Sequence, residues 1–147
     1  MTIILATDHA GFAMKEHLKR FLEKGGHTFE DVGAHALDPD DDYPMYMQAA
    51  AEMLLKTPNS VGIVFGGSGQ GEAMVLNRYQ GIRAIVYAAS NPDLVKTGRE
   101  HNDANVLSVG ARFLSPMQVE VAVEVFLSTI FSAEERHQRR IEQIDAS

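Results

Sequence analysis

The 147-residue sequence contains no cysteine. This absence excludes disulfide bonds, thiolate zinc sites and any cysteine nucleophile or base, whichever compartment holds the protein. Long hydrophobic runs are also missing, because no stretch approaches the roughly 18 apolar residues of a membrane span. The apolar run at residues 2–7 is too short to be the core of a signal peptide. We therefore expect a cytoplasmic protein without membrane contacts.

Positive charge is scarce, with 13 Lys and Arg residues against 20 Asp and Glu residues and a formal net charge of -7. Such a field repels nucleic acids and anionic lipids, so we expect no nucleic-acid partner and only local binding of small anions. With 45% hydrophobic residues and only 5 prolines, the chain has the composition of an ordinary globular domain. We expect a single domain over residues 1–147.

Short apolar segments alternate with amphipathic segments along the chain. The expected strands cover residues 2–7, 27–32, 61–65, 82–88 and 105–109, with helical patterns between them. This alternation predicts an α/β fold, namely a Rossmann-like, doubly wound sheet of five parallel strands flanked by helices. Ligands of such sheets bind beyond the carboxyl ends of the strands, so polar residues just after strands become the candidates for a site.

The C-terminal segment is predicted to form a separate tail helix. Ser132 with Glu135 three residues later has the pattern of a capping box, which marks a helix start. The segment that follows is polar apart from Ile141 and Ile144. Because so polar a helix has little core contact of its own, we expect it to pack against a partner chain.

The strongest local motif is the glycine-rich run GGSGQGE at residues 66–72, directly after an expected strand and at the start of a helix. Glycines let successive backbone N–H groups converge on one point, and a helix N-terminus adds partial positive charge. The run therefore predicts a site for an anion or a developing oxyanion, with an ordinary tight turn as the alternative. A dinucleotide fingerprint does not fit, because Glu72 stands where its third glycine or alanine belongs, and the lysine of a Walker loop is missing.

Glu72 falls in the first turn of the helix that follows this glycine loop. A favourable interaction with the helix dipole is the simpler interpretation of its position. However, a carboxylate beside converging N–H donors is the combination that removes a proton next to a carbonyl group while stabilising the enediolate oxygen. We therefore consider Glu72 a candidate general base.

Polar residues also occur at the boundaries of the first and fifth strands. Asp8 and His9 end the first strand, and His101 and Asn102 lie shortly before the fifth. Each pair alone could be a cap or a turn. Two such pairs beside a glycine loop favour a site over two unrelated turns.

Three arginines could bind a phosphate group. Arg136 and Arg140 are four residues apart in the expected tail helix and so share one face, and Arg112 lies just beyond the fifth strand. A solvated helix face is the alternative, but paired guanidinium groups suit a phosphate dianion. The candidates offer no cluster of histidine and carboxylate ligands at metal-binding spacing, so we expect neither a metal nor a nucleotide cofactor.

Taken together, these segments resemble the type B ribose-5-phosphate isomerase family, which also contains the galactose-6-phosphate isomerase subunits. The resemblance runs from about residue 2 to residue 144. It rests on the segments DHAGF (8–12), DYP (42–44), GGSGQGE (66–72), GIRA (81–84), REHNDANVL (99–107), GAR (110–112) and RHQRR (136–140). The resemblance implies a homodimer or a dimer of dimers, with the tail helix at the dimer interface and active sites shared between two chains.

The resemblance also implies catalytic roles. Asp8 and His101 would assist the opening of the sugar ring. Ser68 and the backbone N–H groups from Gly67 to Gly71, including that of Gly69, would hold the enediolate.

Further residues would bind the substrate by the same resemblance. Tyr43 and Asn102 would bind sugar hydroxyls. The phosphate would be held by four cationic side chains, of which the last two would come from the neighbouring subunit: His9, Arg112, Arg136 and Arg140.

At one position the sequence departs from many members of that family. Where they carry a base cysteine, two residues before the Ser or Thr of the glycine loop, this chain has Gly66. It resembles instead the cysteine-free subgroup, in which the glutamate at the position of Glu72 transfers the proton. The complete absence of cysteine agrees with this assignment.

The resulting hypothesis is an aldose–ketose isomerase that interconverts D-ribose 5-phosphate and D-ribulose 5-phosphate. Glu72 would transfer a proton between C2 and C1 through a cis-enediolate, without a metal. One alternative is the same chemistry on a tetrose or hexose phosphate. Another is a non-catalytic module that binds a phosphate or a nucleotide, because a fold alone does not determine function.

Overall fold

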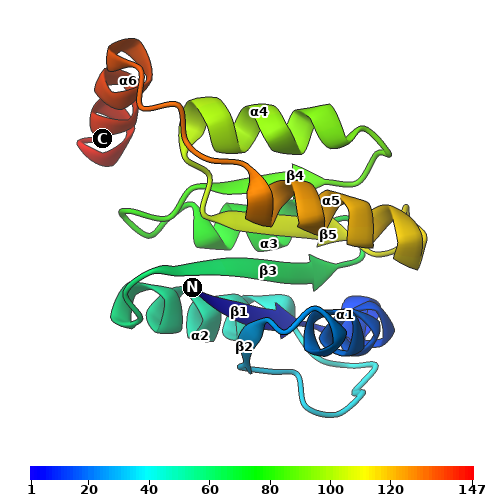
Figure 1. Cartoon of the computed structure of the whole chain (residues 1–147). Helices are drawn as coiled ribbons and strands as arrows, with labels where there is room; N and C mark the ends of the chain where they lie inside the picture. The colour runs from blue at the N-terminus through cyan, green and yellow to red at the C-terminus, as the bar shows by residue number, and fades with distance from the viewer.

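A five-stranded parallel sheet forms the centre of the structure, a computed structural model that describes residues 1–147 (Figure 1). The strands lie in the order β2-β1-β3-β5-β4. Their bounds differ from the predicted ones by at most two residues at either end. The strands are β1 (Thr2–Thr7), β2 (Thr28–Asp31), β3 (Ser60–Gly66), β4 (Ala84–Tyr87) and β5 (Val106–Gly110). The predicted fold class is therefore confirmed.

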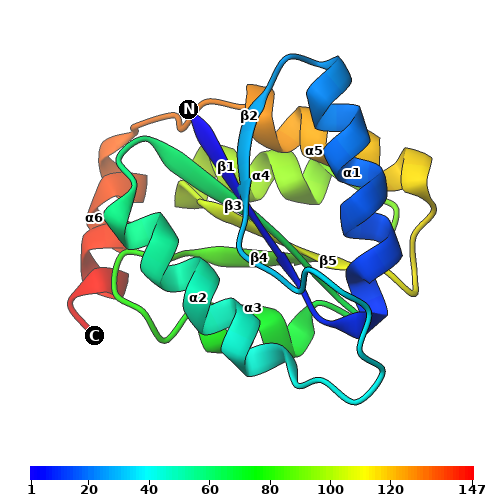
Figure 2. The same ribbon diagram turned by 90° about the horizontal axis from the view of Figure 1, so that it is seen from below.

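Helices cover both faces of the sheet, as Figure 2 shows. One face packs against α1 (Phe12–Lys24), α4 (Pro92–Asn102) and α5 (Pro116–Ser128). The other packs against α2 (Tyr43–Lys56) and α3 (Gln70–Leu76). Two hydrophobic clusters fill the layers, because alternate residues of the central strands point to opposite faces, as Ile3 and Ile4 do.

The order of the strands creates a switch point between β1 and β3. From β1 the chain moves outward to β2, and it then crosses to the other side of β1 to form β3. Helices α1 and α3 consequently leave these two neighbouring strands on opposite faces of the sheet. A crevice opens at such a point beyond the carboxyl ends of the strands. The segments entering it are the 3-10 turn His9–Gly11, which follows β1, and the glycine loop, which follows β3.

The tail helix α6 (Glu135–Asp145) is present but lies away from the strand tips. In Figure 1 the arrows of β1 and β3 point away from α6, which stands beside the end of α4. The predicted capping box at Ser132 is wrong, because no side chain caps this helix and Glu134 occupies its N-cap. Ala133 adopts a left-handed backbone with φ 53, which takes Ser132 out of the helical path. None of the helices has the length and apolar character needed to cross a bilayer.

Candidate active site

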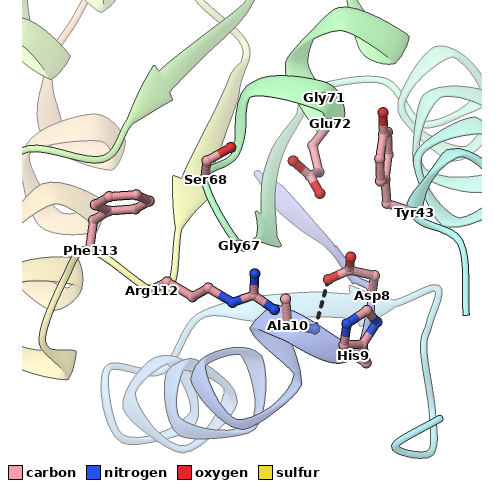
Figure 3. A pocket seen from close by; sticks show the side chains of 10 residues that line it. All are labelled: Asp8, His9, Ala10, Tyr43, Gly67, Ser68, Gly71, Glu72, Arg112 and Phe113. Carbon is pink, nitrogen blue, oxygen red and sulfur yellow. Dashed lines mark hydrogen bonds between the residues drawn. The ribbon is translucent and has the colours of Figure 1, made fainter. Parts of the chain in front are cut away.

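The crevice between β1 and β3 contains a cavity of about 440 Å³. Figure 3 shows the side chains that line it. Seven of the predicted site residues lie in its wall together with Glu72: Asp8, His9, Tyr43, Gly67, Ser68, Gly71 and Arg112. Four elements distant in sequence therefore meet at one point, as expected for the carboxyl edge of a parallel sheet.

Glu72 is held in the wall of this cavity by the first turn of α3. Its side chain is buried, with 4% of the residue exposed. Burial raises the pKa of the Glu72 carboxyl, and the negative charge of Asp8 raises it further, while the backbone N–H of Glu72 opposes the shift. A carboxylate with a raised pKa is suited to accept and return a proton near neutral pH.

Gly66 provides the space that the Glu72 carboxyl group occupies. A methyl group on Gly66 would lie 2.5 Å from Oε2 of Glu72, and nearer still to the other carboxyl oxygen. Any larger residue at position 66 therefore competes with Glu72 for the same volume. Position 66 is the one at which the sequence departs from the cysteine-containing members of the family it resembles.

The glycine loop after β3 turns directly into the N-terminus of α3. Gly69, the N-cap of α3, adopts a left-handed conformation with φ 78 that disfavours other residues. Ser108 of β5 fixes the turn, because its hydroxyl donates a 2.6 Å hydrogen bond to the carbonyl oxygen of Gly69. Gly67, Ser68 and Gly71 of this loop line the crevice, where backbone N–H groups and a hydroxyl could stabilise a negatively charged oxygen.

The turn after β1 groups Asp8, His9 and Asp41, which we call the acid–imidazole cluster. Ala10 N–H donates a 3.0 Å hydrogen bond to Oδ1 of Asp8. His9 donates two hydrogen bonds to Oδ1 of Asp41, one from its backbone N–H at 3.0 Å and one from Nδ1 at 2.7 Å. Potential ligand atoms of the cluster lie within 4.8 Å of one another, a spacing that the sequence did not predict. Because Oδ1 of Asp41 already accepts two hydrogen bonds from His9, we interpret the cluster as a hydrogen-bonded pair beside Asp8 and not as a set of metal ligands.

Arg112 and Tyr43 complete the cavity from two other elements. Arg112, exposed and without an ion-pair partner, enters from the loop after β5 (Figure 3). Its guanidinium lies close to Gly67, where an added side chain would meet Nη1 at 3.1 Å. Tyr43 begins α2 and packs against Gly71, whose missing side chain leaves room for the phenol. A free guanidinium and a phenol provide donors for an anion and for hydroxyl groups.

Five predicted site residues do not line this cavity in the same chain. Gly69 lies within the glycine loop itself, whereas the other four lie elsewhere: His101, Asn102, Arg136 and Arg140. Helix α4 runs antiparallel to the strands, so its last residues lie at the amino edge of the sheet. There Arg83, which precedes β4, donates a 3.0 Å hydrogen bond from Nε to the carbonyl oxygen of Asn102. The expectation that His101 and Asn102 flank the glycine loop within one chain is therefore wrong, because a segment that leads into a parallel strand lies at the edge opposite to the strand tips.

His101 is joined to the tail helix by a stacked pair of imidazoles. Its ring lies 4.4 Å from that of His137 with an interplanar angle of 12°. His137 is buried, and burial lowers its pKa, with the charges of His101 and Arg136 acting in the same direction. The stack places His101 and Asn102 at the same end of the molecule as Arg136 and Arg140, so these four residues form a second group of their own.

Sequence reasoning missed Asp41. The signal was the acidic run Asp40–Asp42 in the loop after β2, since β2 neighbours β1 and its carboxyl end faces the same edge. Within this run, only Asp42 belongs to the DYP segment that carries the family resemblance.

The fold and the cavity define an α/β protein that combines a buried carboxylate of raised pKa with a glycine-rich loop at a helix N-terminus and a guanidinium without an ion-pair partner. This combination of groups is suited to an enzyme that removes protons from small anionic carbonyl compounds. The family model described as Ribose/Galactose Isomerase matches residues 3–144, and the chain belongs to this family of sugar isomerases.

Relatives and solved structures agree with this assignment. The chain is 39% identical to ribose-5-phosphate isomerase B of Mycolicibacterium paratuberculosis over 97% of its length and 88% of the relative's. A ribose 5-phosphate isomerase structure from Thermotoga maritima superposes with a TM-score of 0.93 at 36% identity, covering 99% of this chain and 98% of the other. The Mycoplasma genitalium ribose-5-phosphate isomerase B with bound ribulose-5-phosphate superposes with a TM-score of 0.92 at 30% identity, covering 99% and 94%.

Proposed function

We propose that this isomerase interconverts D-ribose 5-phosphate and D-ribulose 5-phosphate by metal-free proton transfer through a cis-enediolate. The observation that carries the proposal is Glu72, a buried carboxylate of raised pKa in the wall of a cavity that also holds the glycine loop. The relatives' names and the ribulose-5-phosphate bound in the Mycoplasma genitalium structure support the substrate. Membership of an isomerase family favours an enzyme over a non-catalytic phosphate-binding module.

In the proposed reaction, Glu72 removes the proton from C2 of the open-chain aldose. The electron pair of that C–H bond forms the C1–C2 double bond, and the carbonyl oxygen O1 takes the negative charge. Backbone N–H groups of the glycine loop and the Ser68 hydroxyl stabilise this oxygen. After a proton passes from O2 to O1, the protonated Glu72 delivers its proton to C1, and the 2-ketose results. Both half-reactions use one carboxylate, which is left unchanged.

The phosphate lies at the other end of the cavity in this proposal. His9 and Arg112 line the cavity and are the cationic donors that the chain itself supplies there. Tyr43 would bind a hydroxyl of the sugar, and Asp8 would assist ring opening by accepting the proton of the anomeric hydroxyl. We assign these roles to one domain over residues 1–147, working in the cytoplasm.

The remaining predicted residues enter through a second copy of the chain. We propose a homodimer in which the partner contributes the group at the amino edge: His101, Asn102, Arg136 and Arg140. Two observations support this arrangement: none of the four lines the cavity of its own chain, and the arginines are exposed on a polar helix. A two-fold interface would then complete two equivalent sites. A dimer of dimers would form by a further, separate association of two such homodimers.

The test is turnover of a panel of four-, five- and six-carbon aldose phosphates in a metal-free buffer. We expect D-ribose 5-phosphate to have the highest kcat/KM. Solvent deuterium should enter the product at C1, because a carboxylate exchanges its proton with water between the two half-reactions. Turnover of a six-carbon phosphate with none of the pentose would refute the substrate. Full retention of the C2 hydrogen would refute the enediolate.

A further inference from the structure

His9 and Asp41 form an ion pair at the edge of the cavity that neither the fold nor the glycine loop requires. Asp41 lies in the loop between β2 and α2, 32 residues from His9, and its side chain is only 4% exposed, against 31% for that of His9. Both His9 hydrogen bonds go to the same oxygen, Oδ1, so the backbone and the ring of His9 are fixed by one carboxylate.

Burial of the Asp41 carboxylate favours a proton on the facing nitrogen of His9, Nδ1. The second oxygen of Asp41, Oδ2, is buried and makes no hydrogen bond of good geometry, although the nearby Tyr46 hydroxyl also lowers the pKa of Asp41. A buried carboxylate with one unpartnered oxygen is costly unless a cation neutralises it. The hydrogen bonds from His9 lower the pKa of Asp41 against the opposing effect of burial, so Asp41 is ionised and Nδ1 of His9 carries a proton.

The charged groups facing His9 are Asp41, Asp8 and Arg112. The hydrogen bond to Asp41 makes the largest contribution and raises the His9 pKa, and the charges of Asp8 and Asp41 act in the same direction. Partial burial and the charge of Arg112 oppose them. The balance favours an imidazolium, which has a second N–H at Nε2, the ring nitrogen not engaged by Asp41.

We propose that Asp41 is a positioning residue that holds His9 as a cation with Nδ1–H fixed, so that Nε2–H donates to the substrate phosphate. This inference rests on the proposed function only in taking the phosphate as the group that His9 meets. Asp41 itself does not touch the substrate. It supplies the orientation and the charge of a histidine that would otherwise be neutral for much of the time near pH 7.

The test compares Asp41→Asn with Asp40→Asn. Asparagine keeps the shape of Asp41 and an oxygen that can accept both hydrogen bonds, but it removes the charge. Asp40 is an exposed acid one residue away with no side-chain hydrogen bond to His9, so its variant controls for the loss of one negative charge from the same loop. The His9 ring is followed by NMR through a pH titration, with and without inorganic phosphate, and its signal is identified by its absence from His9→Gln.

We expect the His9 pKa to fall in Asp41→Asn and to stay unchanged in Asp40→Asn. The apparent Kd for inorganic phosphate and the KM for D-ribose 5-phosphate should rise about tenfold near pH 7.5, the scale of one charge-assisted hydrogen bond. The value of kcat should change little, because the proposed function places His9 at the phosphate and not at C1 or C2. The KM difference should shrink as the pH falls below the His9 pKa of the variant, where both proteins carry the imidazolium.

Equal His9 titrations in the two variants would overturn the proposal. So would an unchanged KM in Asp41→Asn, or a loss confined to kcat. If the wild-type protein turned over no sugar phosphate, the proposed function would fail, but the titration with inorganic phosphate would still decide the role of Asp41. Asp41→Ala serves as a second variant, in which both hydrogen bonds are lost and the rise in KM should be at least as large.

Discussion

Replacing Gly66 by alanine tests whether position 66 acts through Glu72. The backbone of Gly66 does not adopt a positive φ, so alanine is compatible with the strand. The new methyl carbon would nevertheless lie 2.5 Å from Oε2 of Glu72. Since ordinary carbon contacts begin near 3.5 Å, the carboxyl group must move by about 1 Å or more.

A displacement of this size should change the free energy of unfolding little but should lower the rate of catalysis strongly. Misplacing a reacting group by about 1 Å costs on the order of a hundredfold in rate, so kcat of Gly66→Ala should fall by about that factor. KM should change little, because the residues proposed to bind phosphate are untouched. Gly62→Ala provides the control in the same strand, since its methyl group would meet Leu54 and Val106 at 3.1 Å but not the cavity. That variant should retain kcat.

A double-mutant cycle with Glu72→Gln makes the reasoning refutable. If Gly66→Ala acts only by moving the catalytic carboxyl group, it should cost little further activity once Glu72 has been replaced. The assay is ketose formation from D-ribose 5-phosphate at saturating substrate, with the melting temperature of each variant measured in parallel. An equal loss of kcat in both backgrounds would mean that alanine damages the site by another route, and the link between Gly66 and Glu72 would be abandoned.

Three further predictions concern the base, the absence of a metal requirement and the second subunit. Glu72→Gln should lower kcat on the order of a thousandfold with little change in substrate binding. The Glu72 pKa is raised in the folded state, so the free energy of unfolding of the wild type falls as the pH rises from the unfolded pKa through the folded one. The variant should therefore have a higher melting temperature than the wild type near pH 8 and the same melting temperature near pH 4. Exhaustive chelation should leave activity unchanged, and a loss restored by a divalent cation would instead make the acid–imidazole cluster a metal site. Refolding Glu72→Gln together with the double variant Arg136→Ala, Arg140→Ala should restore up to about a quarter of the sites, whereas mixed dimers without activity would exclude a shared site.

Much of the architecture could be predicted from the sequence because the strands are short, apolar and separated by clear helical patterns. Ile3 and Ile4 exemplify the reason: both are buried, on opposite faces, so the strand is apolar throughout. The glycine loop and Glu72 could be predicted for a similar reason, because these residues are contiguous in sequence and a single turn into a helix brings them together. The order of the strands could not be predicted, because it depends on long-range packing.

The errors arose where the spatial position of a residue depends on the direction of an element. His101 is close in sequence to β5, but it precedes the strand and therefore lies at the amino edge, away from the glycine loop. Asp41 was missed for the opposite reason, because only the pairing of β2 with β1 brings the loop that follows β2 against His9. Ser132 is a residue type that often caps helices, but the left-handed backbone of Ala133 next to it keeps Ser132 out of the N-cap position.

The general base and the phosphate of the substrate require opposite charges in their surroundings, and both lie in one cavity in the proposed function. A general base needs a raised pKa, which burial and the neighbouring charge of Asp8 supply to Glu72. A phosphate needs cations, and any cation close to Glu72 would lower its pKa and weaken it as a base. The structure meets both requirements, because Asp8 raises the pKa of Glu72 and that of His9, and Asp41 raises the pKa of His9 against the opposing charge of Arg112. In an acidic protein, a buried aspartate that keeps a histidine protonated adds a cation at the phosphate end without placing one beside the base.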